Sequence, residues 1–210
     1  MKITFFSDTH TKHDNLKFPE ADVLVCTGDF TNKGSLADVE DFCSFMLKQP
    51  HKHIIVIAGN HDFCFENKFK SDAEHLLKVA GITYLNDSGC IIDGVKFWGS
   101  PVQPWFYDWA FNRQRGDDIK KHWNLIPDDI DVLLTHGPPY NILDKCKDGS
   151  VVGCQDLMNR IHDVKPKIHA FGHIHESYGI FVDNHTTYIN SSILDHRYKF
   201  RNEPITIEIL

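Results

Sequence analysis

Residues 53–58 form an apolar, largely β-branched run that ends abruptly in the polar tetrapeptide Gly59-Asn60-His61-Asp62. Asparagine and aspartate are poor strand residues, and glycine adopts backbone angles that other residues avoid, so a buried strand is expected to end here. A tight turn would explain one such ending, but a turn does not need histidine. Four other predicted strands end in the same kind of motif, namely Asp8-x-His10, Gly28-Asp29, His136-Gly137 and Gly172-His173-x-His175. Five endings of this kind indicate a common cause.

The order of the first predicted elements indicates an α/β fold. Residues 2–6, 21–27 and 54–58 are predicted strands, and the near-continuous apolar run at 21–27 is typical of a strand covered on both faces. Apolar residues recur at helical intervals between Leu36 and Leu47, with Ser35 in the N-cap position. The β-β-α-β order of residues 1–60 therefore predicts helices on the faces of a mostly parallel sheet.

The remaining sequence continues this alternation. Further helices are predicted at residues 71–80, near 117–123 and at 154–164, and further strands at 83–85, 132–135 and 168–171. Hairpins are predicted around Asp93-Gly94 and Asp183-Asn184, and residues 205–209 alternate as in a closing antiparallel strand. No repeat, low-complexity tract or linker interrupts the pattern, so we expect residues 1–210 to form one domain.

Composition narrows the classes of partner. The net charge of −7 argues against a surface for non-specific duplex nucleic acid or for anionic membranes. No apolar run approaches the ~20 residues of a membrane helix, and the first residues lack a signal-peptide pattern. The six cysteines form no Cys-x-x-Cys pair, as expected of reduced thiols. We therefore expect a soluble, cytoplasmic protein.

The strand-end motifs carry the chemistry. Ligands of open α/β sheets bind beyond the carboxyl ends of the strands, where these side chains can converge. The candidate metal ligands are Asp8, His10, Asp29, Asn60, His136, His173 and His175. A sulfur-free set of oxygens and imidazoles suits manganese, iron, zinc or nickel, and seven groups suit two ions better than one. Two cations ~3.5–4 Å apart can clamp a phosphoryl group and activate water.

In order and spacing, the five motifs resemble the calcineurin-like metallophosphoesterase superfamily, from residue 8 to residue 175. A narrower resemblance is to small metallophosphoesterase-domain proteins that also occur in animals. It rests on residues 135–139 (Thr-His-Gly-Pro-Pro), Gly153-Cys154 and residues 171–176 (Phe-Gly-His-Ile-His-Glu). The resemblance implies a sandwich of two mixed β-sheets flanked by helices.

The resemblance also implies roles for individual residues. Asp8, His10 and His175 would hold one metal ion, Asn60, His136 and His173 would hold the other, and Asp29 would bridge the two. His61 would not bind metal. It would stabilise the phosphate and protonate the leaving oxygen, and Asp62 would orient its ring. Asp62 stands where many relatives have glutamate.

The segment 101–115, called here the aromatic insert, leaves two interpretations open. It contains Trp105, Phe106, Tyr107, Trp109 and Phe111, followed by Arg113 and Arg115. The insert is either a self-packed loop or homodimer contact, or a substrate wall in which Trp105 and Trp109 meet a base and Arg113 meets a phosphate.

These features favour an enzyme that hydrolyses small phosphate esters, possibly nucleotides, with two metal ions. Apart from Lys12, no lysine or arginine accompanies the metal motifs, and the insert offers apolar rings for a second ester group. Diesters are therefore the expected substrates. The alternatives are a non-catalytic metal-binding interaction module of the same fold and a nuclease acting on single strands.

Overall fold

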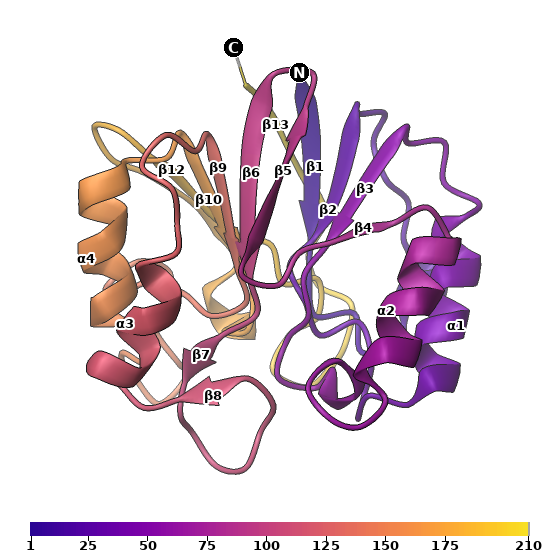
Figure 1. The fold of residues 1–210 in the computed structure, drawn as a ribbon, viewed down its shortest axis with the longest axis horizontal. Coiled ribbons are helices and arrows are strands. Elements are labelled where there is room, and N and C mark those ends of the chain that lie inside the picture. Colours follow the sequence, from indigo (N-terminus) through magenta and orange to yellow (C-terminus); the bar gives the residue numbers. More distant parts are fainter. Residues whose placement is uncertain (210) are drawn as a thin grey trace.

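The apolar runs of the sequence form two mixed β-sheets, which the computed structural model describes together with their connections for residues 1–209 (Figure 1). The first sheet has the order β13 (Ile205–Glu208), β1 (Lys2–Phe6), β2 (Val23–Cys26), β3 (His53–Val56) and β4 (Thr83–Tyr84). The second has the order β11 (Gly179–Val182), β12 (Thr187–Asn190), β10 (Ile168–Phe171), β9 (Val132–Thr135), β6 (Val95–Ser100) and β5 (Ser88–Ile92). In each sheet a parallel centre is flanked by antiparallel strands, β13 in the first and β5 and β11 in the second.

Helices cover the outer face of each sheet. Figure 1 shows α1 (Leu36–Met46) and α2 (Lys70–Val79) beside the first sheet, and α3 (Asp117–Trp123) and α4 (Gln155–Val164) beside the second. Ser35 caps α1 as expected, because its side chain accepts a hydrogen bond from the backbone of Asp38. The predicted sandwich of two mixed sheets flanked by helices is therefore confirmed.

Strand alternation explains how each central strand can be buried on both faces. In β2, Val23 and Val25 face the second sheet, whereas Leu24 and Cys26 pack beneath α1 and α2. In the core between the sheets, apolar residues of the first sheet, such as Phe5, pack against apolar residues of β6, β9, β10 and β12. This double burial is the reason why the run at 21–27 is apolar almost without interruption.

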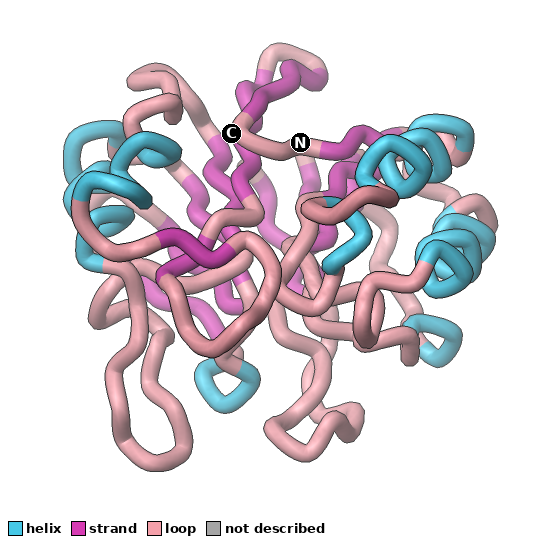
Figure 2. Tube along the Cα trace, turned by 60° about the horizontal axis from the view of Figure 1, so that its bottom comes forward, coloured by secondary structure: helices cyan, strands magenta, loops and turns pink. Residues whose placement is uncertain are grey.

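The two sheets meet at the edge where their parallel strands end. Ser7, directly after β1, forms an isolated parallel bridge with Ser192, which follows β12. The amide of Ile193 also donates to the carbonyl of Ser7 at 3.0 Å. Figure 2 shows this edge from below, where loops and short turns cover the strand ends. All five polar motifs therefore lie on one side of the molecule.

The aromatic insert contains an element that the sequence analysis did not predict. β7 (Gln103–Pro104) and β8 (Asn112–Arg113) form a two-stranded parallel sheet of their own. The insert leaves β6 at its carboxyl end, loops out below the second sheet through β7 and β8, and then enters α3 (Figure 1). Within residues 1–209, no helix has the length and apolar character needed to cross a membrane.

Candidate metal centre and active site

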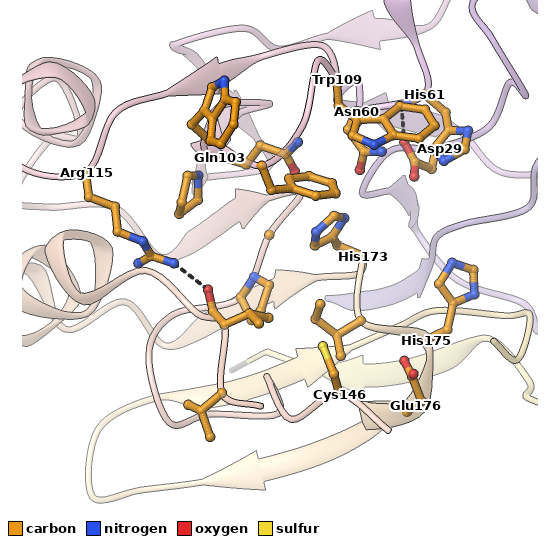
Figure 3. A pocket seen from close by; sticks show the side chains of 18 of the residues that line it. Asp29, Asn60, His61, Gln103, Trp109, Arg115, Cys146, His173, His175 and Glu176 are labelled. Carbon is orange, nitrogen blue, oxygen red and sulfur yellow. Dashed lines mark hydrogen bonds between the residues drawn. The ribbon is translucent and has the colours of Figure 1, made fainter. Parts of the chain in front are cut away.

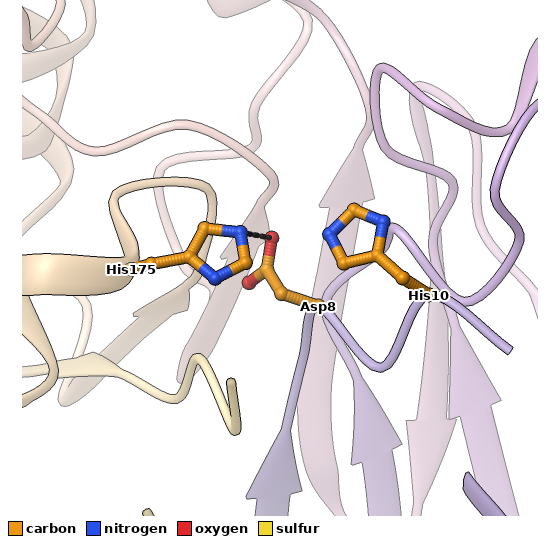
Figure 4. Close-up of side chains that lie close together, drawn as sticks. All are labelled: Asp8, His10 and His175. Carbon is orange, nitrogen blue, oxygen red and sulfur yellow. Dashed lines mark ion pairs between the residues drawn. The ribbon is translucent and has the colours of Figure 1, made fainter. Parts of the chain in front are cut away.

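The first group of candidate ligands combines the ends of β1 and β10. Asp8 and His10 follow β1, and His175 begins the short turn after β10 (Figure 4). Ligand atoms from the three residues lie within 4.8 Å of one another, and His175 Nε2 is 3.7 Å from Asp8 Oδ1. Asp8 and His10 both have positive φ angles, a costly conformation for residues other than glycine. The fold holds this strained corner in place from both sheets.

The second group combines the ends of β2, β3, β9 and β10. Ligand atoms of Asp29, His136 and His173 lie within 4.8 Å of one another. His136 Nε2 is 3.3 Å from Asp29 Oδ2 and 3.0 Å from Asn60 Oδ1. The structure thus brings together the three side chains expected around one ion, with Asp29 beside them.

Asp29 stands between the two groups. Its Oδ2 is 3.3 Å from His136 Nε2 in the second group and 3.9 Å from His10 Nε2 in the first. Asp29, His10 and His61 also form a third compact group within 4.8 Å. A carboxylate in this place can contact two cations at once, as bridging requires.

Two glycines permit this close approach. A Cβ on Gly59 would lie 2.3 Å from Asp29 Oδ1, and one on Gly172 would lie 2.2 Å from Asp8 Oδ2. Real Cβ atoms do not come so close, so any side chain at either position would displace a carboxylate. Gly59 and Gly172 are therefore required by the geometry of the centre.

Backbone carbonyls orient the imidazoles. His136 Nδ1 lies 2.8 Å from the carbonyl oxygen of Thr27, and His175 Nδ1 lies 2.9 Å from that of Leu194. A carbonyl can only accept, so each Nδ1 carries a proton and each Nε2 faces the centre. Metal-binding histidines are held in this way by partners outside the metal's own ligands.

His10 provides the sharpest test of whether the centre fits metal. Both of its ring nitrogens are buried, and neither has a hydrogen-bond partner among the described residues. Burial lowers the pKa of His10 to about 4 and that of His173 to about 3, so both rings are neutral at physiological pH. A neutral buried imidazole without a partner is costly, unless a cation accepts its lone pair.

The carboxylate and the remaining imidazole fit metal as well. Burial alone would raise the pKa of Asp29, but the adjacent His136 holds it well below its usual range. Burial alone would lower the pKa of His136, but Asp29 raises it to about 9. Positive charge is therefore favoured between these two side chains, and the residues present fit a pair of metal ions.

The structure gives His61 and Asp62 different partners from those expected. His61 Nδ1 lies 2.6 Å from the carbonyl oxygen of Asn32, not against the carboxylate of Asp62. The expected contact between Asp62 and the imidazole is therefore wrong. The oxygens of Asp62 instead accept hydrogen bonds from the amides of Asp29, Gly59 and Thr31 and from the Thr31 hydroxyl. Asp62 ties together the loops that carry Asp29 and Asn60, because it faces the protein interior rather than the site.

A cavity of about 550 Å³ opens directly above the ligands (Figure 3). Trp105, Phe106 and Trp109 of the aromatic insert line it, as do His61 and His173. The rings are in contact with the centre, since Trp109 lies 4.3 Å from His61 and Phe106 lies 5.1 Å from His173, centroid to centroid. The insert is therefore a wall of the cavity that contains the candidate ligands.

Arg113, Phe111 and Tyr107 of the insert do not line the cavity. Arg113, expected at a substrate phosphate, instead pairs with Glu66 and His122 and is not among the residues that line the cavity. Phe111 is buried in the core beneath the first sheet, and Tyr107 is 76% exposed. The expected role of Arg113 thus has no geometric support, because its guanidinium is held by Glu66 and His122 instead.

The cavity also contains Tyr198, which sequence reasoning missed, and Arg115, which the sequence places at the end of the aromatic insert. Tyr198 packs against His10 and His175, with ring centroids 4.7 and 5.4 Å away. Arg115 lines the opposite side and donates to the carbonyl oxygens of Val152 and Gly153 (Figure 3). Tyr198 lies far in sequence from every motif, so no local signal could have identified it. Arg115, in contrast, belongs to the aromatic insert.

Comparisons with known proteins agree with this geometry. The family model described as "Calcineurin-like phosphoesterase" matches residues 1–177. Human "Metallophosphoesterase domain-containing protein 1" is 40% identical over 225 residues, which cover 97% of this chain and 69% of the human protein. A UPF0046 protein of Caenorhabditis elegans is 39% identical over 229 residues, covering 100% of this chain and 81% of the relative. A solved structure from Thermus thermophilus superposes with a TM-score of 0.63 at 15% identity, over 98% of this chain and 97% of that one, and so shares the fold.

Proposed function

Because the chain belongs to the calcineurin-like phosphoesterase family, whose members are metal-dependent phosphoesterases, we propose that it hydrolyses phosphodiesters with His61 as general acid. The observation that carries the proposal is the position of Asp29 between two groups of ligands at the floor of an aromatic-walled cavity. Two bound metal ions would neutralise the phosphoryl oxygens and lower the pKa of the attacking water. Manganese is the expected ion, and iron, zinc and nickel also suit this set of oxygens and imidazoles.

The surroundings of His61 support its role as a proton donor. Its Nδ1 is engaged by the carbonyl of Asn32, so Nε2 is the nitrogen left to exchange a proton with a bound ester. The ring lines the cavity and lies 4.5 Å from the ring of His10, centroid to centroid. His61 is therefore near the phosphoryl group without being needed as a ligand, and it can protonate the departing oxygen.

The charges around the cavity support diesters over monoesters. A monoester carries nearly two negative charges at neutral pH, and its terminal oxygens need cations beyond the metal ions. Among the described residues that line the cavity, Arg115 is the only lysine or arginine, and its guanidinium already serves two backbone carbonyls. Trp105 and Trp109 instead offer apolar surface to a second ester substituent, such as the base of a small nucleotide.

The test compares bis(4-nitrophenyl) phosphate with 4-nitrophenyl phosphate, which release the same leaving group. Both are assayed at one pH with the same metal loading. We expect a higher kcat/KM for the diester. A clear advantage for the monoester would overturn the proposed preference while leaving metal-dependent hydrolysis intact.

A further inference from the structure

Glu66 joins the segment that carries His61 to the aromatic insert. Its carboxylate accepts a hydrogen bond from the amide of Phe111 and another, at 2.9 Å, from Nη1 of Arg113. The amide of Ala110 also donates to the carbonyl of Asn60 at 3.3 Å. The insert is thus attached to residues 60–66 by three hydrogen bonds, one of them an ion pair.

Arg113 is held from its other side as well. Its Nε donates to His122 Nε2 at 3.2 Å, and His122 Nδ1 in turn donates to Asp87 at 2.6 Å. Glu66 follows the first sheet, whereas His122 belongs to α3 beside the second. Arg113 therefore links the segment that follows β3 of the first sheet to the helix that covers the second sheet.

Hydrogen bonds within the insert make it one unit, so the contacts of Arg113 also constrain the rest of the insert. The side-chain amide nitrogen of Gln103 donates to the carbonyl of Ala110 and to Oδ1 of Asn112, both at 3.3 Å. The amide nitrogen of Asn112 donates to the carbonyls of Phe106 and Tyr107, at 3.1 and 2.8 Å. A displacement of Arg113 is therefore expected to move the whole loop that carries Trp109.

Trp109 is the residue of the insert that contacts His61, the proposed general acid. Its indole lies over the ring of His61 at 4.3 Å between centroids, with 32° between the planes. The same indole contacts Phe63, centroid to centroid at 5.8 Å. Rotation of the His61 ring about its Cβ–Cγ bond is thus limited by Trp109 on its face and by the Asn32 carbonyl at Nδ1.

We propose that Glu66 and Arg113 are positioning residues that set Trp109 against His61 and so fix the direction in which His61 delivers its proton. This role rests on the proposed function, in which His61 is the general acid. The side chains of Arg113 and Glu66 are 30% and 34% exposed, so their ion pair adds little to stability. Glu66→Gln and Arg113→Gln are therefore expected to fold normally.

The first experiment observes the position of the ring without catalysis. The indole shifts the NMR signals of the His61 ring protons, and Trp109→Ala gives their values when that influence is removed. In the protein loaded with zinc, which is diamagnetic and leaves these signals observable, we expect Glu66→Gln and Arg113→Gln to move them towards the Trp109→Ala values. The matched control is Glu74→Gln, which breaks the comparably exposed ion pair with Lys70 on α2 and is expected to move nothing. Unchanged signals in both Glu66→Gln and Arg113→Gln would overturn the proposal.

The second experiment compares methyl phenyl phosphate with methyl 4-nitrophenyl phosphate, because phenolate needs a proton far more than nitrophenolate does. General acid catalysis contributes ~10²–10⁴-fold, and we expect each variant to lose roughly tenfold in kcat with the phenyl ester and little with the nitrophenyl ester. In a His61→Ala background, the same variants should leave the ratio of the two rates unchanged. Equal losses with both esters, or a loss that persists without His61, would assign the pair to packing alone.

The two experiments separate failure of this inference from failure of the proposed function. If His61→Ala itself does not discriminate between the esters, the general acid is wrong, and the NMR signals alone decide whether the pair positions the ring. If His61→Ala discriminates but Glu66→Gln and Arg113→Gln do not, the general acid stands and the positioning role is refuted.

Discussion

The candidate ligands and the aromatic insert face each other across one cavity, but they are built in opposite ways. Each ligand directly follows a buried strand or lies within four residues of its end, and Asp8, Asp29 and His136 have almost no contact with solvent. The insert holds its place through side-chain hydrogen bonds between distant residues, and Trp105, directly after β7, is 53% exposed. The candidate ligands belong to the framework of the fold, whereas the insert is attached to that framework by side-chain contacts. Metal binding and substrate selectivity can therefore be perturbed separately.

Removal of metal is expected to have the largest effect on hydrolysis, because the candidate ligands act only through the metal ions that they bind. Chelation should abolish ester hydrolysis, and addition of manganese or a similar ion should restore it. The measurement is turnover of bis(4-nitrophenyl) phosphate alongside elemental analysis. Undiminished turnover in a sample verified as metal-free would refute the metal-dependent mechanism.

His61 lies where the two regions touch, so its loss should affect chemistry without affecting metal content. His61→Ala should slow hydrolysis of an ester with an alkyl leaving group by ~10²–10⁴-fold and hydrolysis of a nitrophenyl ester much less. Elemental analysis should find the metal content unchanged. His75→Ala, at an exposed histidine of α2, is the control. Equal defects with both esters would exclude His61 as the acid.

The Asp62→Asn variant tests whether the loops that carry the candidate ligands depend on Asp62 for their stability. In Asp62→Asn, an NH₂ group replaces one acceptor oxygen, so either the amides of Asp29 and Gly59 or the donors of Thr31 lose their partner. Unsatisfied buried donors should cost about 2–3 kcal/mol of the free energy of unfolding, measured by urea denaturation. Asp72→Asn, an exposed aspartate of α2, should cost almost nothing. A stability equal to that of the parent protein would mean that Asp62 does not support these loops.

With nitrophenyl esters, whose leaving group needs no proton, changes in the insert should show the smallest effects, and these should be confined to selectivity. Trp105→Ala and Trp109→Ala should each reduce the advantage of bis(4-nitrophenyl) phosphate over 4-nitrophenyl phosphate by roughly 2- to 10-fold, the loss of one aromatic contact. The shared leaving group removes any effect that passes through His61. Tyr107→Ala is the control, because this ring lies in the same insert but points to solvent. If neither tryptophan variant changes the ratio, the insert serves packing or self-association instead.

The convergence of the candidate ligands could be predicted from the sequence because local rules govern it. Apolar periodicity located the strands, and parallel strands of one sheet must end at the same edge, so His10 and Asp29 were expected to be neighbours before any contact was known. The cap at Ser35 and the turn at Asp93-Gly94 follow from equally local chemistry; both turn residues have positive φ angles.

The remaining parts of the site depend on contacts between residues that are distant in sequence. Asp62 was expected to face His61, its neighbour in the chain, but the turn after β3 directs its carboxylate inwards to the amides of Asp29 and Thr31. Arg113 was expected at the substrate because it follows a group of aromatic residues. Its true partner, Glu66, lies 47 residues earlier and had no distinguishing pattern. Tyr198 reaches His10 only because the two sheets meet.

Metal content of the Asp29→Asn variant tests the central claim most directly, because two ions that share one carboxylate must both depend on it. Metal titration should find two sites in the parent protein, and Asp29→Asn should lose more metal affinity than His10→Ala, which removes a ligand of one ion only. Asp72→Asn, the same chemical change at an exposed position, should bind as the parent does. Two ions retained at parental affinity in Asp29→Asn would contradict the account of a shared, bridging aspartate.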